Sequence, residues 1–414
     1  MISKVFIYPK KIDGTPSSFP VDFTRYLAGN SAIGKITSSV DNSDFVIGAF
    51  SINNCKIKFF NRDGIFSENA SGGFPYGRDG SLVSIEVGDP YTNSNNRIVF
   101  QGYVDDIGSK EDPITESFEI LVVGVEGRLR KEQMPVNLIT GGTLSSQALQ
   151  LILQDANLRG GGSVNVELDL DPTIDNPSVF NGKSRWEAMN RILKIANSYA
   201  RIQRTYENNS FTENLDLYSR TRKIPSNETV RKFYGPYDNQ NDLPTARGPL
   251  ILSVARWNSG IQRSFNRISF NDESVEDPDY IQIYGLREYS ASDQIITSTE
   301  ISRAVAANIL EKFKNPKQEF EIIVKLADAS DISVGDIVQI YYPRKNDGKN
   351  NRVGSSMIGS AQIAKEYGGF AIYQHLGFLV YATEHNLDSF TTKLKLREYG
   401  HGVADGLDFR EPSP

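Results

Sequence analysis

Short stretches in which apolar and polar residues alternate recur along most of the chain, and they restrict its possible folds more than any other feature. In residues 52–59, Cys55 and Ile57 are separated by polar side chains, which is the pattern of a strand with one buried face. Residues 117–125 are apolar enough to be buried on both faces, whereas residues 320–326 are expected to form an edge or partly exposed strand. Because many such strands lie at short spacing, a barrel or sandwich is expected. Further strands are expected at residues 83–87, 98–104, 214–218, 251–257, 267–270, 337–342, 377–384 and 391–398.

Helical periodicity interrupts this β pattern in three places. One helix is expected within residues 143–157, where apolar residues recur every three or four positions. A second begins at Ser184, which forms a capping box with Glu187, so that each side chain satisfies a free amide at the helix start. A third follows a similar capping pattern, Thr297-Ser298-Thr299-Glu300, and ends before Pro316.

The order of these elements predicts an α+β chain, mainly β, in which two β-barrel-like domains flank a mixed helical and strand domain. Residues 234–249, rich in Pro, Gly and Asn, are expected to be a linker. The predicted boundaries are 1–130 for the first barrel, 131–250 for the middle domain and linker, 251–400 for the second barrel with one helix and a long insertion at 344–375, and 401–414 for a tail.

The composition argues against several classes of protein. The 414 residues carry 45 Lys and Arg against 51 Asp and Glu, and a net charge of −6 does not suit a coat on nucleic acid or on an anionic membrane. No apolar run approaches the roughly 20 residues that cross a bilayer, and we expect no targeting segment at the N-terminus. Cys55 is the only cysteine, which rules out an intrachain disulfide and favours synthesis in a reducing compartment.

Candidate reactive groups are few. The three histidines, His375, His385 and His401, do not have the close spacing of metal ligands, and we expect each to be structural or on the surface. Cys55 alternates with buried positions and is expected to be a core thiol rather than a nucleophile. The sequence therefore predicts no metal centre, no bound cofactor and no catalytic residue.

Glycine runs, acidic pairs and basic runs also have ordinary structural interpretations. The glycine runs lack the neighbours of phosphate-binding loops and are expected to be turns or joints; they are residues 72–73, 141–142 and 160–162. The acidic pairs lie in polar segments and are expected to be solvated, although they leave open a glycosidase or cell-wall-cleaving site; they are Asp105/Asp106, Asp169/Asp171 and Glu273/Glu276. The basic runs are expected on solvated faces or in ion pairs at a subunit contact; they are residues 128–131, 201–204 and 220–223.

The order of several short motifs resembles the hub proteins of bacteriophage tails. Residues 55–67 contain the turn Asn61-Arg62-Asp63-Gly64-Ile65-Phe66, and the strands at 84–88 and 99–107 follow, as in the first barrel of that family. The C-terminal half resembles the second barrel of the family in residues 279–289, the helix from Glu300, and residues 320–326, 334–338 and 379–398. The helix 184–201 with the strand 215–220 resembles the middle domain of the family.

The resemblance implies a structural, non-enzymatic role in the virion. It implies a homotrimer whose six barrels form a symmetry adapter at the tail tip, a baseplate hub assembled in the host cytoplasm. The implied partners are the tail tube or distal tail protein, a central spike or fibre and the tape measure protein, with DNA only passing through the lumen and no membrane span.

Two features depart from the pattern of the family, and two other functions stay open. The insertion at 344–375 is longer than the loop expected there, and no lysozyme or peptidase module is attached. One alternative is the distal tail protein, a hexameric ring with a single barrel that anchors receptor-binding proteins. The other is a virion-associated cell-wall hydrolase that uses an acidic pair such as Asp169 and Asp171.

Overall fold

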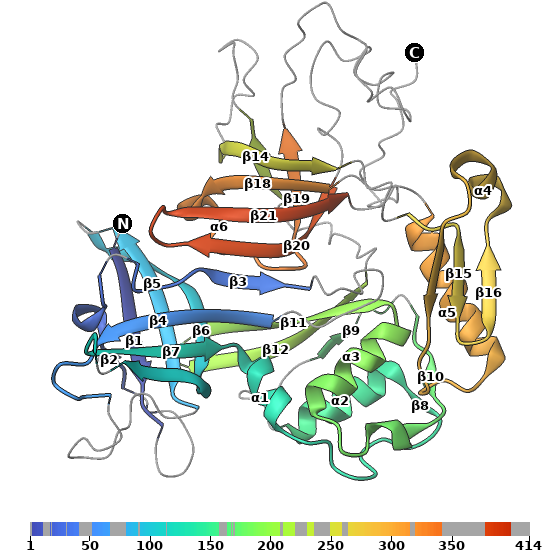
Figure 1. Ribbon diagram of the computed structural model, residues 1–414, viewed down its shortest axis with the longest axis horizontal. Coiled ribbons are helices and arrows are strands. Elements are labelled where there is room, and N and C mark those ends of the chain that lie inside the picture. The colour runs from blue at the N-terminus through green and yellow to red at the C-terminus, as the bar shows by residue number, and fades with distance from the viewer. Residues whose placement is uncertain are drawn as a thin grey trace, which may run out of the picture.

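The computed structural model shows a chain of two barrels, a helical domain and a small α/β unit (Figure 1). The structure describes residues 2–10, 17, 19–29, 31–40, 52–66, 80–89, 92–112, 114–156, 164–166, 168, 170–207, 210–219, 230–235, 249–258, 264–314, 319–341 and 377–398. The predicted insertion at 344–375 and tail at 401–414, and most of the predicted linker at 234–249, lie outside these residues.

The N-terminal strands form the first barrel. They are β1 (Ile2–Tyr8), β2 (Val21–Asp22), β3 (Ile36–Ser39), β4 (Ile52–Phe60), β5 (Leu82–Asp89), β6 (Thr92–Asp112) and β7 (Ser117–Val123). They pair in the order β2-β1-β5-β6-β7-β4-β3, and every pair is antiparallel. The segment between β2 and β3 closes the barrel, because the N–H of Phe23 donates to the carbonyl of Val5 at 2.9 Å and Ile33 forms a bridge with Ile57.

The turn after β4 shows why residues 61–66 have their composition. The Asn61 side chain accepts a hydrogen bond from the Phe66 N–H at 2.9 Å, and Gly64 adopts a φ of 63°, which glycine tolerates best. This turn folds the Phe66 ring back into the barrel, where it stacks on Phe59 and Phe118 at centroid distances of 4.9 and 5.4 Å. The turn motif therefore contributes directly to the core of the first barrel.

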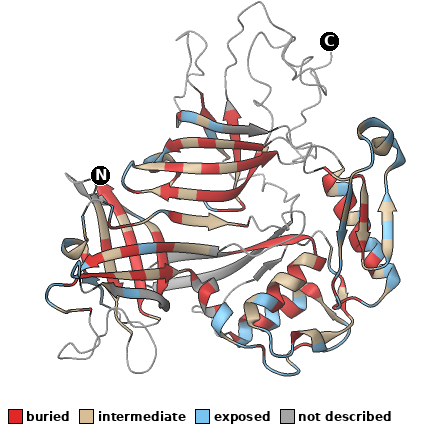
Figure 2. Ribbon diagram, viewed as in Figure 1, coloured by how far each residue is buried: buried red, intermediate tan, exposed pale blue. Residues whose placement is uncertain are grey.

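The C-terminal strands form the second barrel. They are β13 (Arg231–Tyr234), β14 (Ile251–Asn258), β18 (Glu319–Lys325), β19 (Ile337–Tyr341), β20 (Gly377–Asn386) and β21 (Thr391–Glu398), with the short helix α6 (Leu326–Ala329) after β18. They pair in the order β13-β19-β20-β21-β18-β14. The barrel is closed where the N–H of Tyr234, at the end of β13, donates to the carbonyl of Pro249, just before β14, at 2.9 Å. Figure 2 shows that buried residues line the strands of both barrels.

Strand β3 joins the two barrels into one sheet. It pairs with β4 of the first barrel along one edge and with β20 of the second barrel along the other, both antiparallel. The result is a continuous 13-stranded sheet in which Ile36 lies opposite His385 and Ser39 opposite Ala382. Because hydrogen bonds fix the register of β3 on both sides, the two barrels are held in one relative orientation.

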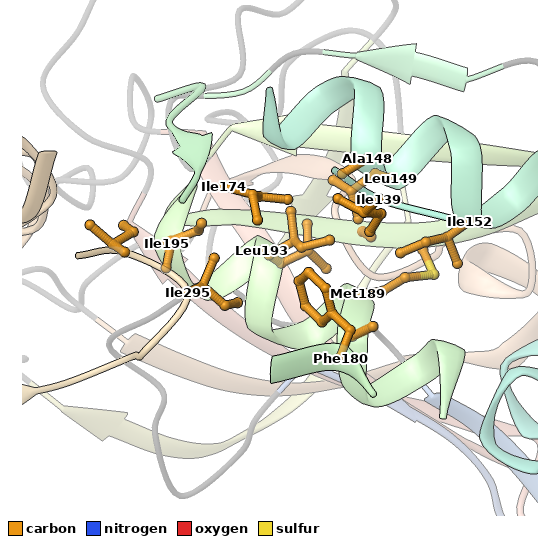
Figure 3. Packing of buried hydrophobic residues seen from close by; sticks show 14 of the residues in the cluster. Ile139, Ala148, Leu149, Ile152, Ile174, Phe180, Met189, Leu193, Ile195 and Ile295 are labelled. Carbon is orange, nitrogen blue, oxygen red and sulfur yellow. The ribbon is translucent and has the colours of Figure 1, made fainter. Parts of the chain in front are cut away.

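Helices in the middle of the chain pack around an apolar core, part of which is seen in Figure 3. The elements are α1 (Val125–Lys131), β8 (Thr143–Leu144), α2 (Ser145–Asp155), β9 (Val164–Val166), β10 (Thr173–Ile174), the 3-10 turn η2 (Pro177–Phe180), α3 (Arg185–Ile195), β11 (Ser198–Glu207) and β12 (Ser210–Ser219). The capping box predicted at Ser184 and Glu187 is present at the start of α3. Ile152 of α2 and Met189 and Leu193 of α3 are fully buried in this core.

Residues 264–314 form a small α/β unit that packs on the helical domain. Its elements are β15 (Arg267–Phe270), β16 (Glu273–Glu276), α4 (Pro278–Tyr284), β17 (Glu288–Ala291) and α5 (Thr299–Phe313). The strands form their own sheet, β16-β15-β17, and α5 contacts both β15 and β16. Ile268, Ile295 and Phe313 belong to the same buried cluster as the helices α2 and α3.

Several predicted strands are confirmed, and the chain is mainly β as expected. Two predicted boundaries coincide with the structure, at residues 267–270 and 391–398. Strand β7 is buried on one face and half-buried on the other, so the prediction of burial on both faces is wrong. Strand β18 lies between β14 and β21, so residues 320–326 do not form an edge strand; the alternative of a partly exposed strand is confirmed, since one face is half-buried and Lys325 is exposed.

The C-terminal half differs most from expectation. Residues 279–289, matched by their motif to the second barrel, instead form most of α4 and the start of β17 in the separate small sheet. The described part of residues 251–400 has the three helices α4, α5 and α6 where one was predicted. The capping box predicted at Thr297 is absent: Ser298 is the N-cap of α5, and its hydroxyl accepts from the N–H of Ile301, which has no carboxylate to reciprocate.

Candidate functional site

Cys55 and His385, two of the candidate reactive groups in the sequence, are both buried in the structure. Burial raises the pKa of the Cys55 thiol to about 12, so this residue is a core thiol and is protonated at neutral pH. His385 is buried between strands, whereas His375 and His401 lie outside the described residues. Within the part of the chain that can be described, no group of three or more His, Cys, Asp or Glu side chains could hold a metal ion.

Two carboxylates of the acidic pairs, Asp171 and Glu276, make local contacts in the described part of the chain. Asp171 accepts hydrogen bonds from the backbone and the hydroxyl of Ser146, at 2.8 and 2.6 Å, and thereby caps the first turn of α2. Its predicted partner Asp169 lies outside the described residues. Glu276 of β16 is paired with Arg267 at 2.6 Å on the outer face of the small sheet. Asp171 and Glu276 therefore stabilise local structure.

Asp105 and the basic run at 128–131 meet next to the first barrel. Lys131 pairs with Asp105 at 3.0 Å. The guanidinium of Arg130 lies over the ring of Trp186, 4.5 Å from its centroid. These cationic side chains are thus engaged within the chain.

The basic run at 201–204 contributes one buried arginine, and it is paired within the chain. Arg201 of β11 is almost fully buried; its guanidinium donates to the carbonyl of Val334 at 2.9 Å and to Asp336 at 2.6 Å. Val334 and Asp336 belong to the turn before β19, so this contact ties the hairpin β11-β12 to the second barrel. The prediction of a solvated face or a subunit contact is wrong for Arg201. Residues 72–73, 160–162 and 220–223 lie outside the described residues.

The structure instead draws attention to the junction at β3 and β20. On the outer side, Lys35 pairs with Glu384 at 2.8 Å across this strand pair. On the inner side, the Nδ1 of His385 lies 2.9 Å from the hydroxyl of Thr392, and both residues are buried. Burial lowers the pKa of His385 to about 4, partly opposed by the Asp331 carboxylate, so the ring is neutral at pH 7.

A small apolar cluster fills the space where β3, β11 and β20 meet. Its members come from four separate regions of the sequence: Val40, Tyr199, Val334, and Leu379 with Tyr381 and Ala382. The N–H of Val40 donates to the carbonyl of Tyr381 at 3.1 Å, which continues the β3-β20 pairing by one residue. The junction therefore has its own core in addition to its hydrogen bonds.

Polar contacts also fix the small α/β unit against its neighbours. The Asp175 carboxylate accepts from the N–H groups of Thr297 and Ser298, at 2.9 and 3.0 Å, just before α5 begins. On the other side, the guanidinium of Arg397 in β21 lies over the ring of Phe313 in α5, 4.8 Å from its centroid. The helical domain and the second barrel are thus both connected to this unit.

Together, these contacts connect the two barrels, the helical domain and the small α/β unit to one another. Sequence reasoning missed the junction. Strand β3 is only four residues long and has no alternating pattern, and Arg201 is an isolated buried charge whose partner lies more than a hundred residues away. None of the described helices combines the length and apolar character needed to cross a membrane.

Comparison with solved structures identifies the fold. Over 98% of both chains, the fold is similar to that of a tail protein from Neisseria meningitidis, with a TM-score of 0.53 and 12% sequence identity. It is also similar to the 43 kDa tail protein of prophage MuSo2 from Shewanella oneidensis, with a TM-score of 0.50, 11% identity, and coverage of 99% of this chain and 100% of that chain. The resemblance to phage tail proteins is thus confirmed at the level of the fold.

The similarity is restricted to structure. No protein-family model matches the chain, and no curated protein matches it in sequence. The two tail proteins are matched along almost their whole length, so the similarity in fold extends over the chain and is not confined to one domain.

Proposed function

We propose that the chain is a structural component of a phage tail baseplate, a trimeric hub that joins the sixfold tail tube to a threefold spike or fibre. The observation that carries the proposal is the pair of barrels locked together by β3 in a single chain. Three copies of a chain with two barrels supply six barrels, which is the number that a symmetry adapter between sixfold and threefold partners requires. The likeness of the whole chain to two tail proteins supports the same assignment.

The rest of the role follows from this position. The hub sits at the tail tip of the virion, forms part of the channel through which DNA leaves, and contacts the tail tube or distal tail protein on one side and the spike or fibre on the other. The tape measure protein is a further partner inside the tube. The proposed role needs no catalysis, and Asp171 and Glu276 of the acidic pairs make local structural contacts. The chain is made and assembled in the host cytoplasm.

The alternative of a hexameric distal tail protein rests on a single barrel with an appended domain. Two barrels in one chain, one built from β1–β7 and the other from β13, β14 and β18–β21, are difficult to reconcile with that arrangement. The two models differ in copy number, which makes them easy to separate by experiment.

The test is the mass of the purified full chain by light scattering on a size-exclusion column, with negative-stain images of the same peak. The proposal predicts three copies and a ring with a central hole. A hexameric ring would support the distal tail protein. A compact monomer at micromolar concentration would refute both, and loss of turbidity of purified cell walls would then support a hydrolase.

A further inference from the structure

The two barrels are built on the same plan, although their sequences do not show it. In each barrel, three consecutive strands pair antiparallel with their neighbours: β5-β6-β7 in the first and β19-β20-β21 in the second. The last of these strands then pairs antiparallel with an earlier strand, β7 with β4 and β21 with β18. Strands β3 and β14 then pair antiparallel with β4 and β18. The plan makes β3 equivalent to β14, and β6 equivalent to β20.

Backbone hydrogen bonds at the strand entries support this equivalence residue by residue. The N–H of Gly80 donates to the carbonyl of Val104 at 3.0 Å, and the N–H of Gly335 donates to the carbonyl of Val380 at 2.8 Å. In both places the valine N–H donates back, at 2.8 Å, to the carbonyl of the residue after the glycine. The two glycines have φ values of 83° and 93°, a conformation that favours glycine. Val104 therefore corresponds to Val380.

Within one chain, the outer edge of β3 is occupied by the second half of β20. Strand β19 pairs with β20 only as far as Leu379, and β3 takes over the same edge from Ala382 to His385. In the first barrel, the equivalent half of β6 has no such partner strand among the described residues. Strand β5 pairs with β6 only as far as Tyr103, and on that edge the described residues leave Asp106–Asp112 without a neighbouring strand.

Strand β14 has the matching open edge. It ends the order of the 13-stranded sheet and pairs with β18 on one side, while on the other side only the preceding Leu250 forms a bridge among the described residues. An open strand edge is a template for pairing with another chain. Exposed apolar side chains lie beside both edges, with Leu252 on β14 at 49% exposure and Ile114 just beyond β6 at 91%.

We propose that β14 of one copy of this chain pairs antiparallel with β6 of the next copy, in the same way that β3 pairs with β20 inside each copy. This inference rests on the proposed trimeric hub and names the strands that join its subunits. One chain supplies an open β14 and an open second half of β6, so the contact is heterologous and three copies can close it into a ring. Alternating inner and outer joints would then connect all six barrels through one continuous sheet.

The register follows from the neighbouring strands. Counting three residues along β21 from the partner of Val380 leads to Lys393, opposite Glu384, and the same count along β7 from the partner of Val104 leads to Glu119, opposite Lys110. Lys110 thus corresponds to Glu384. In the first barrel, Thr37 lies opposite Asn54 of β4, which in turn lies opposite Val123 of β7. In the second barrel, Asn258 lies opposite Glu319 of β18, which in turn lies opposite Arg397 of β21. Thr37 and Asn258 therefore occupy equivalent positions. Because Thr37 lies opposite Glu384, Asn258 of one copy is placed opposite Lys110 of the next.

The test is a disulfide cross-link in the full chain that carries Lys110→Cys and Asn258→Cys. Paired positions on adjacent strands have Cα atoms close enough for a disulfide, so mild oxidation should give a covalent species of three chain masses on a non-reducing gel. Mixing the two single variants should give covalent dimers and no trimer, because the contact is heterologous. The natural thiol of Cys55 is buried and does not compete.

Two controls make the result specific. The equivalent pair inside one chain, Thr37→Cys with Glu384→Cys, should form a disulfide within the monomer, since these residues are already opposite each other. Lys110→Cys combined with Ser274→Cys, an exposed position on the edge strand β16, should give no covalent oligomers on the non-reducing gel. If the cysteine variants do not fold, backbone hydrogen exchange of the unmodified protein replaces them, with protection of residues 106–112 and 256–258 expected in the oligomer.

The outcomes separate this inference from the proposed function. A trimer by light scattering that gives the covalent trimer supports both. A trimer in which the internal pair cross-links and the 110/258 pair does not, or in which residues 106–112 exchange freely, refutes the strand pairing and leaves the trimeric hub standing. A monomer refutes the hub and the pairing together.

Discussion

The joint between the barrels should make folding sensitive to acid through one residue, His385. This side chain is buried where β20 meets β3 and β21, with its Nδ1 2.9 Å from the hydroxyl of Thr392. Desolvation lowers its pKa from 6.5 to about 4, and the Asp331 carboxylate opposes that shift only in part. The folded state therefore holds a neutral ring at pH values where the unfolded chain has already taken up a proton.

The direction and size of the effect follow from linkage. Because the pKa of this base is lower in the folded state, its contribution to the free energy of unfolding is complete above pH 6.5 and is lost as the pH falls toward 4. One pKa unit corresponds to about 1.4 kcal/mol, so His385 alone should cost about 2 kcal/mol between pH 7 and pH 5 and about 3 kcal/mol by pH 4.

The assay is urea unfolding of the natural chain and of His385→Asn at pH 7, 6 and 5, followed by tryptophan fluorescence. The chain has two tryptophans, and a Trp186→Phe background leaves Trp257 on β14 as a reporter for the second barrel. The variant should be less stable at pH 7 by about 1–3 kcal/mol, from lost packing. The gap in unfolding free energy should then shrink by about 2 kcal/mol at pH 5, because the variant has no ring to protonate.

A second variant separates titration from hydrogen bonding. Thr392→Val removes the hydroxyl beside Nδ1 but leaves the ring buried, so it should lower stability by about 1 kcal/mol and keep the natural pH dependence. The reasoning fails if the gap between the natural chain and His385→Asn is the same at pH 7 and pH 5. It also fails if deuterium exchange at the imidazole C2, read by mass spectrometry, gives His385 a pKa near 6.5.

Three further substitutions test contacts in other parts of the fold. Gly102→Ala should leave most of the protein insoluble, since a Cβ there would lie 2.5 Å from the carbonyl oxygen of Val123; the soluble fraction after expression measures this. Ser184→Ala should lower the free energy of unfolding by about 1 kcal/mol through loss of the α3 cap, and Ser184→Thr should restore most of it. Arg201→Met should lower it by about 1–3 kcal/mol and increase proteolysis between the middle domain and the second barrel, because the Val334 carbonyl loses its donor; an unchanged digestion pattern would contradict this.

Local sequence patterns predicted the barrels well because each strand carries its own evidence. The alternation in β4 and β21 follows from a sheet with one buried face, and the turn at residues 61–66 requires Asn, Gly and Phe for reasons that are visible within six residues. The capping box at Ser184 was predictable for the same reason, because both partners lie within one helical turn. Contacts between residues that lie within about six positions of each other can therefore be predicted from the sequence alone.

The small α/β unit was not predicted, because the sequence of residues 279–289 is compatible with either a strand or a short helix. Residues 279–289 alternate like a strand, yet Asp277 caps the N–H of Tyr280 and starts a short helix. Asn266 then donates to the carbonyls of Tyr280 and Gly285, at 3.3 and 2.7 Å, and fixes the end of that helix. These contacts span up to nineteen residues, beyond the range over which periodicity is informative.

The relation between the two barrels was hidden for a different reason. What they share is a set of backbone hydrogen bonds, and within this set the positive φ at Gly80 and Gly335 favours glycine at those two positions. At other equivalent positions the residue types differ freely, as Lys110 and Glu384 do. The partner of a strand edge is also a property of the assembled sheet: Ile36–Ser39 is a strand because β4 and β20 lie on either side of it. An edge whose partner lies in another copy should therefore leave no pattern in the sequence, and the open edges of β6 and β14 are recognised only because the chain contains a completed version of the same joint.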